Sequence, residues 1–460
     1  MSNSSLASAV CLIIALLLLF LYLILNSSVS SPSLPLHPTK RILNSSSSSS
    51  SPRREKRGDY KKSDFFSHLQ DRFQSSFDNS CKKYPFVEKF REVSNEKFLV
   101  FVLHDPKDGD NLGVGGGWGD NVAGIITATM AATKLDRTLI IQSRDLFSTR
   151  FTIWGVGHDN EKREVAYTRY LELEKDPENV QERMTRCINR CVGWCSFNEA
   201  ETNDTNFPII KYRSNRANLC VWTNKRDKKY FWDLDSLGVT SESDLIEVAG
   251  CLSRLALWPT PLLWSELKTS LGGYASKDMN HLIGAHFRCG DPGFLEGNKG
   301  LEDLSVICAS KDQDHMADTP IELGNCAHQQ LELISGGDDN DDASKTALFV
   351  ATDHQMAKEQ LTAAANWTNI ITFSGECMYQ GGLCASQNAV HWFMLSFAEK
   401  VIARTISHVL LHSAFSRTAG MYGLYPSVYV DAKRCGIPIN NTDQGRRGNG
   451  NWICESRLCS

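Results

Sequence analysis

The feature that most constrains the fold is a regular alternation of short apolar runs and helical patterns in the second half of the chain. The runs lie at 282–287, 346–351, 369–373 and 405–411, and the helical patterns lie at 354–365, 387–403 and 415–422. Continuous apolar runs of this length are typical of strands buried on both faces. Because strands that alternate with helices favour a parallel, doubly wound sheet, we predict an α/β fold.

Three polar segments follow the apolar runs 282–285, 347–350 and 408–411. They are His286-Phe-Arg-Cys-Gly-Asp291, Phe349-Val-Ala-Thr-Asp353 and Ser413-Ala-Phe-Ser-Arg417. In open α/β sheets, ligands bind in the crevice beyond the carboxyl ends of the strands. We therefore expect the three segments to converge on one pocket. A guanidinium, a carboxylate and hydroxyls at a helix start are suited to a nucleoside diphosphate.

Arg288 is the main candidate in the first segment. Its planar guanidinium can bind two phosphate oxygens at once, and the alternative is a structural ion pair with Asp291. His286 lies two residues upstream, so it should share the face of the strand that carries Arg288. It could orient a phosphate or reach a sugar, or it could be a core histidine.

The other two segments offer a carboxylate and hydroxyl groups. Asp353 follows Thr352 at a strand end, where a carboxylate can bind a ribose or a purine edge. The alternative is that Asp353 caps the helix 354–365. Ser413 and Ser416 flank a turn from strand to helix, where a phosphate could bind, although plain helix capping is the alternative. Arg417 adds a second positive charge or lies on the helix surface.

The first half of the chain begins with a strand–loop–helix–strand pattern. A strand is predicted at 98–103, then a glycine-rich loop at 104–119, a helix at 120–135 with Asp120 as its N-cap, and a strand at 137–142. Residues 143–280 show few clear strands and are interpreted as the rest of a first α/β domain with a helical connection. The glycine run lets the backbone approach a ligand, but it lacks the dinucleotide spacing, and no phosphate-binding P-loop motif is present.

The N-terminal residues predict export. A single apolar run, Ala9 to Leu25, follows a short tail, 1–8, and the first basic residues come after it. This pattern favours an uncleaved signal anchor over a cleaved signal peptide, with the body of the protein in the lumen. Residues 26–64 form a serine-rich, basic stem that cannot build a core. A net charge of −4 argues against nucleic acid as a partner.

Cysteine usage agrees with export. The chain has 15 cysteines, and removing Cys11 in the apolar run leaves 15 − 1 = 14, an even number that favours disulfides in an oxidising compartment. Cys187, Cys191 and Cys195 have a spacing that could bind zinc, but no partner motif follows them. Sequons at Asn44, Asn203, Asn366 and Asn440 are compatible with glycosylated loops.

Together, these motifs resemble those of the GDP-fucose-dependent fucosyltransferases, the superfamily of the α-1,6-, nodulation and protein O-fucosyltransferases. The residues that carry the resemblance are His286 to Asp291, Gly116 to Asp120 with Asp136 to Ile141, Phe349 to Asp353 and Ser413 to Ser416. They lie in the family's order between residues 98 and 423. The resemblance implies a GT-B fold, in which two Rossmann-like, doubly wound domains face a cleft. We expect an acceptor-side domain at 65–280 and a nucleotide-sugar domain at 281–460 that includes a cysteine-containing tail.

The resemblance also implies roles. Arg288 would bind the β-phosphate and assist its departure, Asp353 with Thr352 would meet the guanosine, and Ser413, Phe415 and Ser416 would meet the phosphates. Gly117, Gly119 and Asn121 would face the sugar and acceptor, with Asp120 as the best candidate for a general base. The family inverts the anomeric centre without a metal. Where it often has a second basic residue, this chain has Cys289, so leaving-group assistance would come from His286 or Arg417.

The lead hypothesis is a single-pass type II glycosyltransferase of the Golgi or endoplasmic reticulum that transfers fucose from GDP-fucose to a glycan or a protein hydroxyl. It needs no cofactor. A second hypothesis is a metal-dependent GT-A glycosyltransferase, since Asp233-Leu-Asp235 and Asp312-Gln-Asp314 match its DxD pattern. A third is a receptor ectodomain that binds glycans without catalysis, because a fold does not fix a function. The acceptor, its linkage, the disulfide connectivity and the oligomeric state are not determined by the sequence.

Overall fold

The structure is a computed structural model. It describes residues 64–92, 94–102, 118–142, 147–153, 160–184, 207–213, 242–288, 320–334, 344–353, 355–373, 382–405, 414–424, 428–430 and 435. All described residues belong to one compact unit, 61–460. Within the described ranges, no helix combines the length and apolar composition needed to cross a membrane. The predicted anchor, 9–25, lies outside these ranges.

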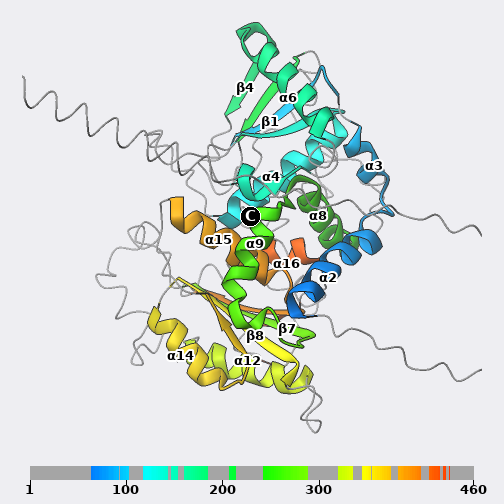
Figure 1. Cartoon of the computed structure of the whole chain (residues 1–460). Helices are drawn as coiled ribbons and strands as arrows, with labels where there is room; N and C mark the ends of the chain where they lie inside the picture. Colours follow the sequence, from blue (N-terminus) through cyan, green and yellow to red (C-terminus); the bar gives the residue numbers. More distant parts are fainter. Residues whose placement is uncertain are drawn as a thin grey trace, which may run out of the picture. The chain divides into compact units, whose positions relative to one another are not determined.

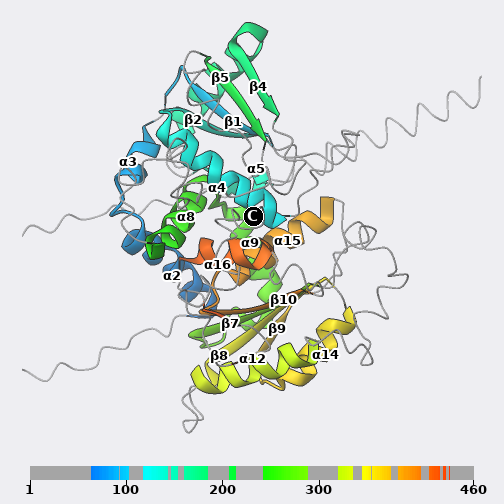
Figure 2. The same cartoon turned by 180° about the vertical axis from the view of Figure 1, so that it is seen from behind.

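The first sheet has four parallel strands in the order β2-β1-β5-β4, which are all labelled in Figure 2 (see also Figure 1). They are β1 (Phe98–Val102), β2 (Thr138–Gln142), β4 (Val180–Met184) and β5 (Ile209–Arg213). Helix α4 (Trp118–Lys134) packs on one face and α6 (Asn160–Glu174) on the other. Since both faces of β1 are covered, all but the last of its residues are buried, which is why it is a continuous apolar run.

The second sheet has five parallel strands in the order β11-β10-β7-β8-β9 (Figure 2). They are β7 (His281–Arg288), β8 (Thr346–Thr352), β9 (Ile370–Thr372), β10 (Lys400–Thr405) and β11 (Val428–Val430). Helices α12 (Pro320–Ile334) and α14 (Gln355–Ala365) cover one face, and α15 (Gly382–Leu395) and α16 (Ala414–Gly423) lie on the other.

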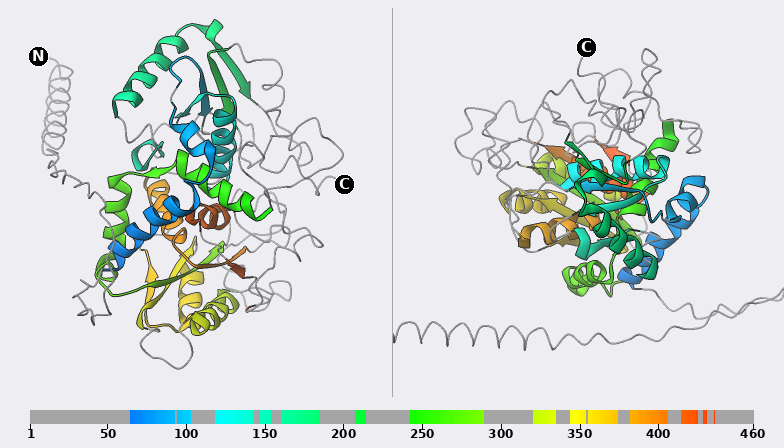
Figure 3. Two further views of the ribbon diagram at one scale, coloured as in Figure 1. Left: turned by 90° about the vertical axis from the view of Figure 1, so that its right-hand side faces the viewer. Right: turned by 90° about the horizontal axis from the view of Figure 1, so that it is seen from above.

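A layer of helices connects the two sheets (Figures 1 and 3). It contains α4, α15 and α16 together with α2 (Phe65–Ser80), α8 (Glu242–Ala256) and α9 (Pro261–Leu271). Helix α16 packs against α4 and α8, which belong with the first sheet, and against α15 and β10 of the second. The short elements are α3 (Pro85–Arg91), α5 (Phe147–Arg150), the antiparallel pair β3 (Phe151–Thr152) and β6 (Trp258–Pro259), and the 3-10 turns Pro177–Asn179 and Gly272–Tyr274.

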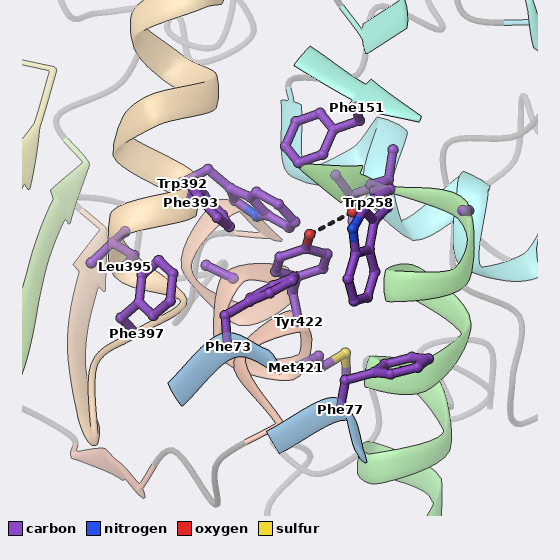
Figure 4. Close-up of a cluster of buried hydrophobic side chains, with 14 of the residues drawn as sticks. Phe73, Phe77, Phe151, Trp258, Trp392, Phe393, Leu395, Phe397, Met421 and Tyr422 are labelled. Atoms are coloured by element: carbon purple, nitrogen blue, oxygen red, sulfur yellow. Dashed lines mark hydrogen bonds between the residues drawn. The ribbon is translucent and has the colours of Figure 1, made fainter. Parts of the chain in front are cut away.

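Aromatic rings fill the centre of this layer (Figure 4). The ring of Tyr422 on α16 lies 4.6 Å from that of Trp392 on α15 and 5.8 Å from that of Phe73 on α2. Its hydroxyl donates a hydrogen bond to the carbonyl of Leu257, drawn as a dashed line in Figure 4. A buried tyrosine usually finds such a partner for its hydroxyl, and burial raises its pKa. One core therefore joins helices from both halves of the chain.

Arg254 of α8 packs against the ring of Phe73 in this cluster and is buried, with 1% of its surface exposed. Its Nε donates to the carbonyl of Tyr422 at 2.7 Å and its Nη2 to that of Gly423 at 3.0 Å. Its Nη1 donates to the carbonyl of Phe73 at 2.6 Å and to Oγ of Ser76 at 2.9 Å. The guanidinium thus ties α8 to α2 and to the carbonyls at the C-terminus of α16, where a positive charge is favourable.

Two disulfides stabilise the described part. Cys81, at the end of α2, is bonded to Cys251 of α8, and Cys326 of α12 is bonded to Cys435. Both link segments more than 100 residues apart, as their sequence separations of 170 and 109 show. The prediction that the chain forms disulfides is confirmed for these four cysteines. The cluster of Cys187, Cys191 and Cys195 lies outside the described residues.

Most predicted elements of the second sheet are confirmed, but the end of one predicted helix and the start of the strand after it are wrong. Strands at 282–287, 346–351 and 369–373 and helices at 354–365 and 415–422 agree with β7, β8, β9, α14 and α16. The predicted helix 387–403 instead ends at Leu395, and the strand that was predicted to begin at 405 begins at Lys400, as β10. Residues 406–411 of the predicted strand lie outside the described residues. Residues 401–403 are buried on both faces of the sheet, so their pattern carries no period that separates strand from helix.

In the first half, the strands at 98–103 and 137–142 and the helix at 120–135 are confirmed as β1, β2 and α4. However, α4 begins at Trp118, so Asp120 lies in its first turn and is not its N-cap. The region 143–280 contains two strands of the first sheet, β4 and β5, that the sequence did not predict. The split into domains at residue 280 stays a prediction.

Candidate functional site

The ends of three neighbouring strands form the edge on which the candidate site is built. Phe287 of β7 pairs with Thr352 of β8, and Arg288 pairs with Thr405 of β10. All three strands run in the same direction, so their carboxyl ends lie together at this edge. The structure therefore brings Arg288, Thr352 and Asp353 to neighbouring positions, as expected from the sequence.

Alternation along β7 decides which face these side chains share. Ile283, Ala285 and Phe287 pack against α12 and α14, whereas Leu282 packs against the helical layer. On this second face, a Cβ added to Gly284 would meet Leu395 of α15 at 2.8 Å. His286 and Arg288 follow at even spacing, so they also point to the face that α15 and α16 cover.

His286 is buried at this face. Its ring lies 5.3 Å from that of Phe415 in the first turn of α16. Burial, and then the positive charges of Arg288 and His391, lower the pKa of His286 to about 3. Its Nδ1 has no hydrogen-bond partner in the part of the chain that the structure describes. At neutral pH the ring is uncharged, so it can donate or accept a hydrogen bond but cannot supply a positive charge.

His391 of α15 is a half-buried histidine with a buried Nε2 that sequence reasoning missed. Its ring packs 6.0 Å from Phe349 of β8 and 5.3 Å from Phe373, and burial lowers its pKa to about 4. Its Nε2 also has no hydrogen-bond partner among the described residues. A lone histidine within the apolar pattern of a helix gives no signal, because a core histidine would occupy the same position.

The start of α16 meets the end of β7. Ser416 lies in the first turn of α16 and is fully buried, and Phe415 before it is half-buried against His286. Free backbone N–H groups at a helix start suit an anion. Ser413 lies outside the described residues. The serine segment and the arginine segment are thus brought together, although β10 ends at Thr405, well before Ser413.

Thr352 ends β8 and Asp353 follows it, and both side chains are half-buried. Helix α14 begins at Gln355, two residues beyond Asp353. Asp353 therefore does not occupy the residue directly before the helix, where an N-cap side chain would be.

The described end of the glycine-rich segment, residues 118 and 119, forms the start of α4. Gly119 is buried in the first turn of α4, and Asn121 is half-buried; Gly117 lies outside the described residues, as does the Asp120 side chain. The ring of Trp118, at the start of α4, lies 6.1 Å from that of Trp392 on α15. The start of α4 therefore packs on α15, the helix that also packs on Gly284 of β7 and Phe349 of β8.

The described residues contain no group of three or more His, Cys, Asp and Glu side chains that could hold a metal ion. The two DxD segments at 233–235 and 312–314 lie outside these residues, so the structure does not test a metal site there.

Comparisons with known proteins come from structure alone, since no family model and no curated protein matches the chain. An arginine-to-lysine mutant of Arabidopsis thaliana FUT1 in complex with GDP is 14% identical, with a TM-score of 0.43 over 79% of each chain. The fucosyltransferase NodZ from Bradyrhizobium is 14% identical, with a TM-score of 0.35 over 72% of this chain and 95% of that one. POFUT1 in complex with GDP-fucose is 12% identical, with a TM-score of 0.38 over 74% and 98%. Similarity this low carries no argument by itself.

Proposed function

We propose that the protein is a glycosyltransferase that transfers fucose from GDP-fucose to a hydroxyl of a glycan or a glycoprotein. The observation that carries the proposal is the junction of β7, β8 and α16. It joins a guanidinium, a carboxylate and a helix start, Arg288, Asp353 and Ser416, at the carboxyl edge of a parallel sheet. The proposal agrees with the names of the solved structures above, but it rests on the chemistry of these residues.

In the proposed reaction, an acceptor oxygen attacks C1 of fucose from the face opposite the diphosphate. The bond between C1 and the phosphate oxygen breaks, GDP leaves with the electron pair, and the acceptor proton passes to a base, for which Asp120 is the candidate. This displacement inverts the anomeric centre. Arg288 and the start of α16 stabilise the charge that develops on the diphosphate, so no metal or other cofactor is needed.

The remaining residues would position the donor. Asp353 and Thr352 accept and donate hydrogen bonds to the guanosine, and Ser413, Phe415 and Ser416 line the diphosphate. His286 assists as a neutral hydrogen-bond partner, which its lowered pKa favours. Gly117, Gly119 and Asn121 face the sugar and the acceptor from the first sheet. This arrangement corresponds to a GT-B cleft between the domains 65–280 and 281–460.

We further propose that the protein is anchored by residues 9–25 in the Golgi or endoplasmic reticulum membrane, with the enzyme in the lumen. The two disulfides support this location, because disulfides persist in oxidising compartments.

Ligand-dependent stability tests the donor. GDP at 100 times its dissociation constant should add about 2.7 kcal/mol to the unfolding free energy of the full-length protein, and UDP should add much less. A fucose-transfer assay with GDP-fucose should proceed in EDTA. Equal stabilisation by UDP argues against the guanine nucleotide, and activity that is lost in EDTA and restored by Mn²⁺ favours the metal-dependent alternative. Stabilisation by GDP without transfer to any acceptor on a glycan array favours a binding protein.

Replacement of Arg288 tests its role. Lysine keeps the positive charge but lacks the planar guanidinium that binds two phosphate oxygens at once. If these hydrogen bonds strengthen as GDP leaves, Arg288→Lys should lower kcat by about 10²-fold or more. The melting temperature should stay near that of the wild type. Arg91→Lys, on the exposed surface of α3, is the matched control and should be fully active. Normal turnover by Arg288→Lys would remove Arg288 from the mechanism.

A further inference from the structure

The turn between α14 and β9 carries a sequon, Asn366-Trp-Thr368, which has no place in the proposed reaction. Compared with the sequons at Asn44, Asn203 and Asn440, it has the advantage that it lies in the part of the chain that the structure describes. Asn366 follows the last residue of α14 and has a φ of +42°, a left-handed conformation that asparagine tolerates better than most residues. Its backbone N–H donates to the carbonyl of Thr362, which ends the helix.

The turn exposes the two residues of the sequon that glycosylation requires, the asparagine and the threonine. Asn366 and Thr368 are exposed, whereas Trp367 between them is partly buried. Nε1 of Trp367 donates to the carbonyl of Thr346 at 2.9 Å, so the ring is fixed against the start of β8. Nδ2 of the buried Asn369 donates to the carbonyl of Ser344 at 2.8 Å. These bonds anchor the turn and leave the amide of Asn366 facing solvent.

We propose that Asn366 carries an N-linked glycan. Its side-chain nitrogen would bond to C1 of an oligosaccharide that a lipid diphosphate donates, as the C1–O bond to the diphosphate breaks and the amide loses one proton. The modification rests on the export that forms part of the proposed function. Two observations independent of the sequon, the disulfides Cys81–Cys251 and Cys326–Cys435, indicate the same compartment.

The sheet topology places this glycan away from the candidate site. Helix α14 runs from the carboxyl end of β8 back to the amino end of β9, since both strands are parallel. Asn366 therefore lies at the amino edge of the sheet, whereas Arg288 and Thr352 lie at the carboxyl edge. The glycan would leave the strand ends open to a nucleotide sugar, so its loss should change stability or secretion and not catalysis.

The test is peptide mapping of the full chain expressed in a eukaryotic secretory host. Enzymatic removal of N-glycans converts each occupied asparagine to aspartate, which mass spectrometry detects. Thr368→Ala should abolish occupancy at Asn366, and Thr368→Ser, which keeps the hydroxyl, should retain it. These variants are preferable to Asn366→Gln, because glutamine would strain the left-handed backbone at this position. Fucose transfer should be the same with and without the glycan.

Occupied Asn366 in the wild type and Thr368→Ser, but not in Thr368→Ala, supports the proposal. Glycans at Asn203 or Asn440 but none at Asn366 would contradict the proposed glycan and still support the export of the protein. A chain without any N-glycan would contradict both the proposed glycan and the proposed export. Transfer activity is measured separately. A protein that is glycosylated at Asn366 but inactive contradicts the proposed enzymatic function and supports the glycan. An active protein without a glycan at Asn366 contradicts the glycan and supports the enzymatic function.

Discussion

Replacing the buried Arg254 with methionine should destabilise the protein more than any exposed arginine replacement. The guanidinium makes four hydrogen bonds from a fully buried position, and it stacks 4.0 Å from the ring of Phe73. Methionine has a similar length but no donor. The variant therefore leaves the carbonyls of Phe73, Tyr422 and Gly423 without this donor inside the core.

The magnitude follows from the acceptors that remain. A buried acceptor left without a partner costs about 1–3 kcal/mol, and removing one member of a buried charged network costs roughly 3–5 kcal/mol in total. Methionine removes the desolvation cost of the buried guanidinium charge, which offsets part of the loss. Apolar replacement of a buried polar group is close to neutral only when its hydrogen-bond partners are replaced as well, and here the backbone carbonyls remain. We expect Arg254→Met to lower the unfolding free energy by about 3–5 kcal/mol, and Arg254→Lys, which keeps one donor group, by less.

Denaturant unfolding of the wild type, both Arg254 variants and Arg91→Met measures this effect. Arg91 on α3 pairs with Glu88 on the surface, where 47% of its side chain is exposed, so Arg91→Met should stay within about 0.5 kcal/mol of the wild type. If Arg254→Met unfolds at the same denaturant concentration as Arg91→Met, the guanidinium contributes nothing net, and its hydrogen bonds do not hold the helical layer together.

Two further predictions concern pH and the disulfides. The folded pKa values of His286 and His391, about 3 and about 4, lie below that of an unfolded histidine, so the unfolded chain binds protons first as the pH falls. The free energy of unfolding should therefore decline as the pH falls from about 6.5 to 4. Where both histidines are protonated only in the unfolded state, the pair should contribute a slope of about 2.7 kcal/mol per pH unit. His391→Phe should halve this slope, and an unchanged slope in equilibrium unfolding would refute the role of His391. The bond Cys81–Cys251 spans 170 residues, so Cys81→Ala with Cys251→Ala should cost up to about 5 kcal/mol, and a variant that melts with the oxidised wild type would show that the bond does not stabilise the fold.

The candidate site was predictable because its strands are buried on both faces. In β7 and β8, continuous apolar runs are followed at once by polar residues, which marks the strand ends at Arg288 and Thr352. The alternation rule also placed His286 on the face of Arg288. What the sequence left open was the state of His286, since only packing shows that the ring is buried beside Phe415.

The error at β10 concerns the point where α15 ends and the strand begins. Helix α15 and strand β10 are joined by the segment 396–399, which contains neither glycine nor proline, so no residue marks the break. Both flanks are apolar because both are buried, and the chain reversal depends on a tertiary bond, from the N–H of Glu399 to the carbonyl of Leu282. Sequence patterns do not contain that bond.

The strands β4 and β5 were not predicted because their residues are too polar, whereas at β10 the flanking residues were apolar. Gln181, Glu182 and Arg183 make β4 too polar to be read as a buried strand, and it lies at the edge of its sheet, where polar residues are common. In β5, Lys211 and Arg213 alternate with apolar residues over only five positions. Arg254 is likewise invisible in the sequence, since its partners come from α2 and α16, far away in the chain.

Helix α16 links this hidden arginine to the candidate site. Its C-terminal carbonyls bind Arg254, and the same end packs so closely on α8 that a Cβ on Gly250 would collide with the carbonyl of Met421. Its first turn holds the ring of Phe415 against that of His286 in β7. A helix of ten residues is about 15 Å long and moves as one body, so a shift at one end displaces the other. Arg254→Lys, if folded, should therefore weaken GDP binding, measured by calorimetry, while Arg91→Lys should not; unchanged affinity would mean that β7 and β8 alone fix the nucleotide.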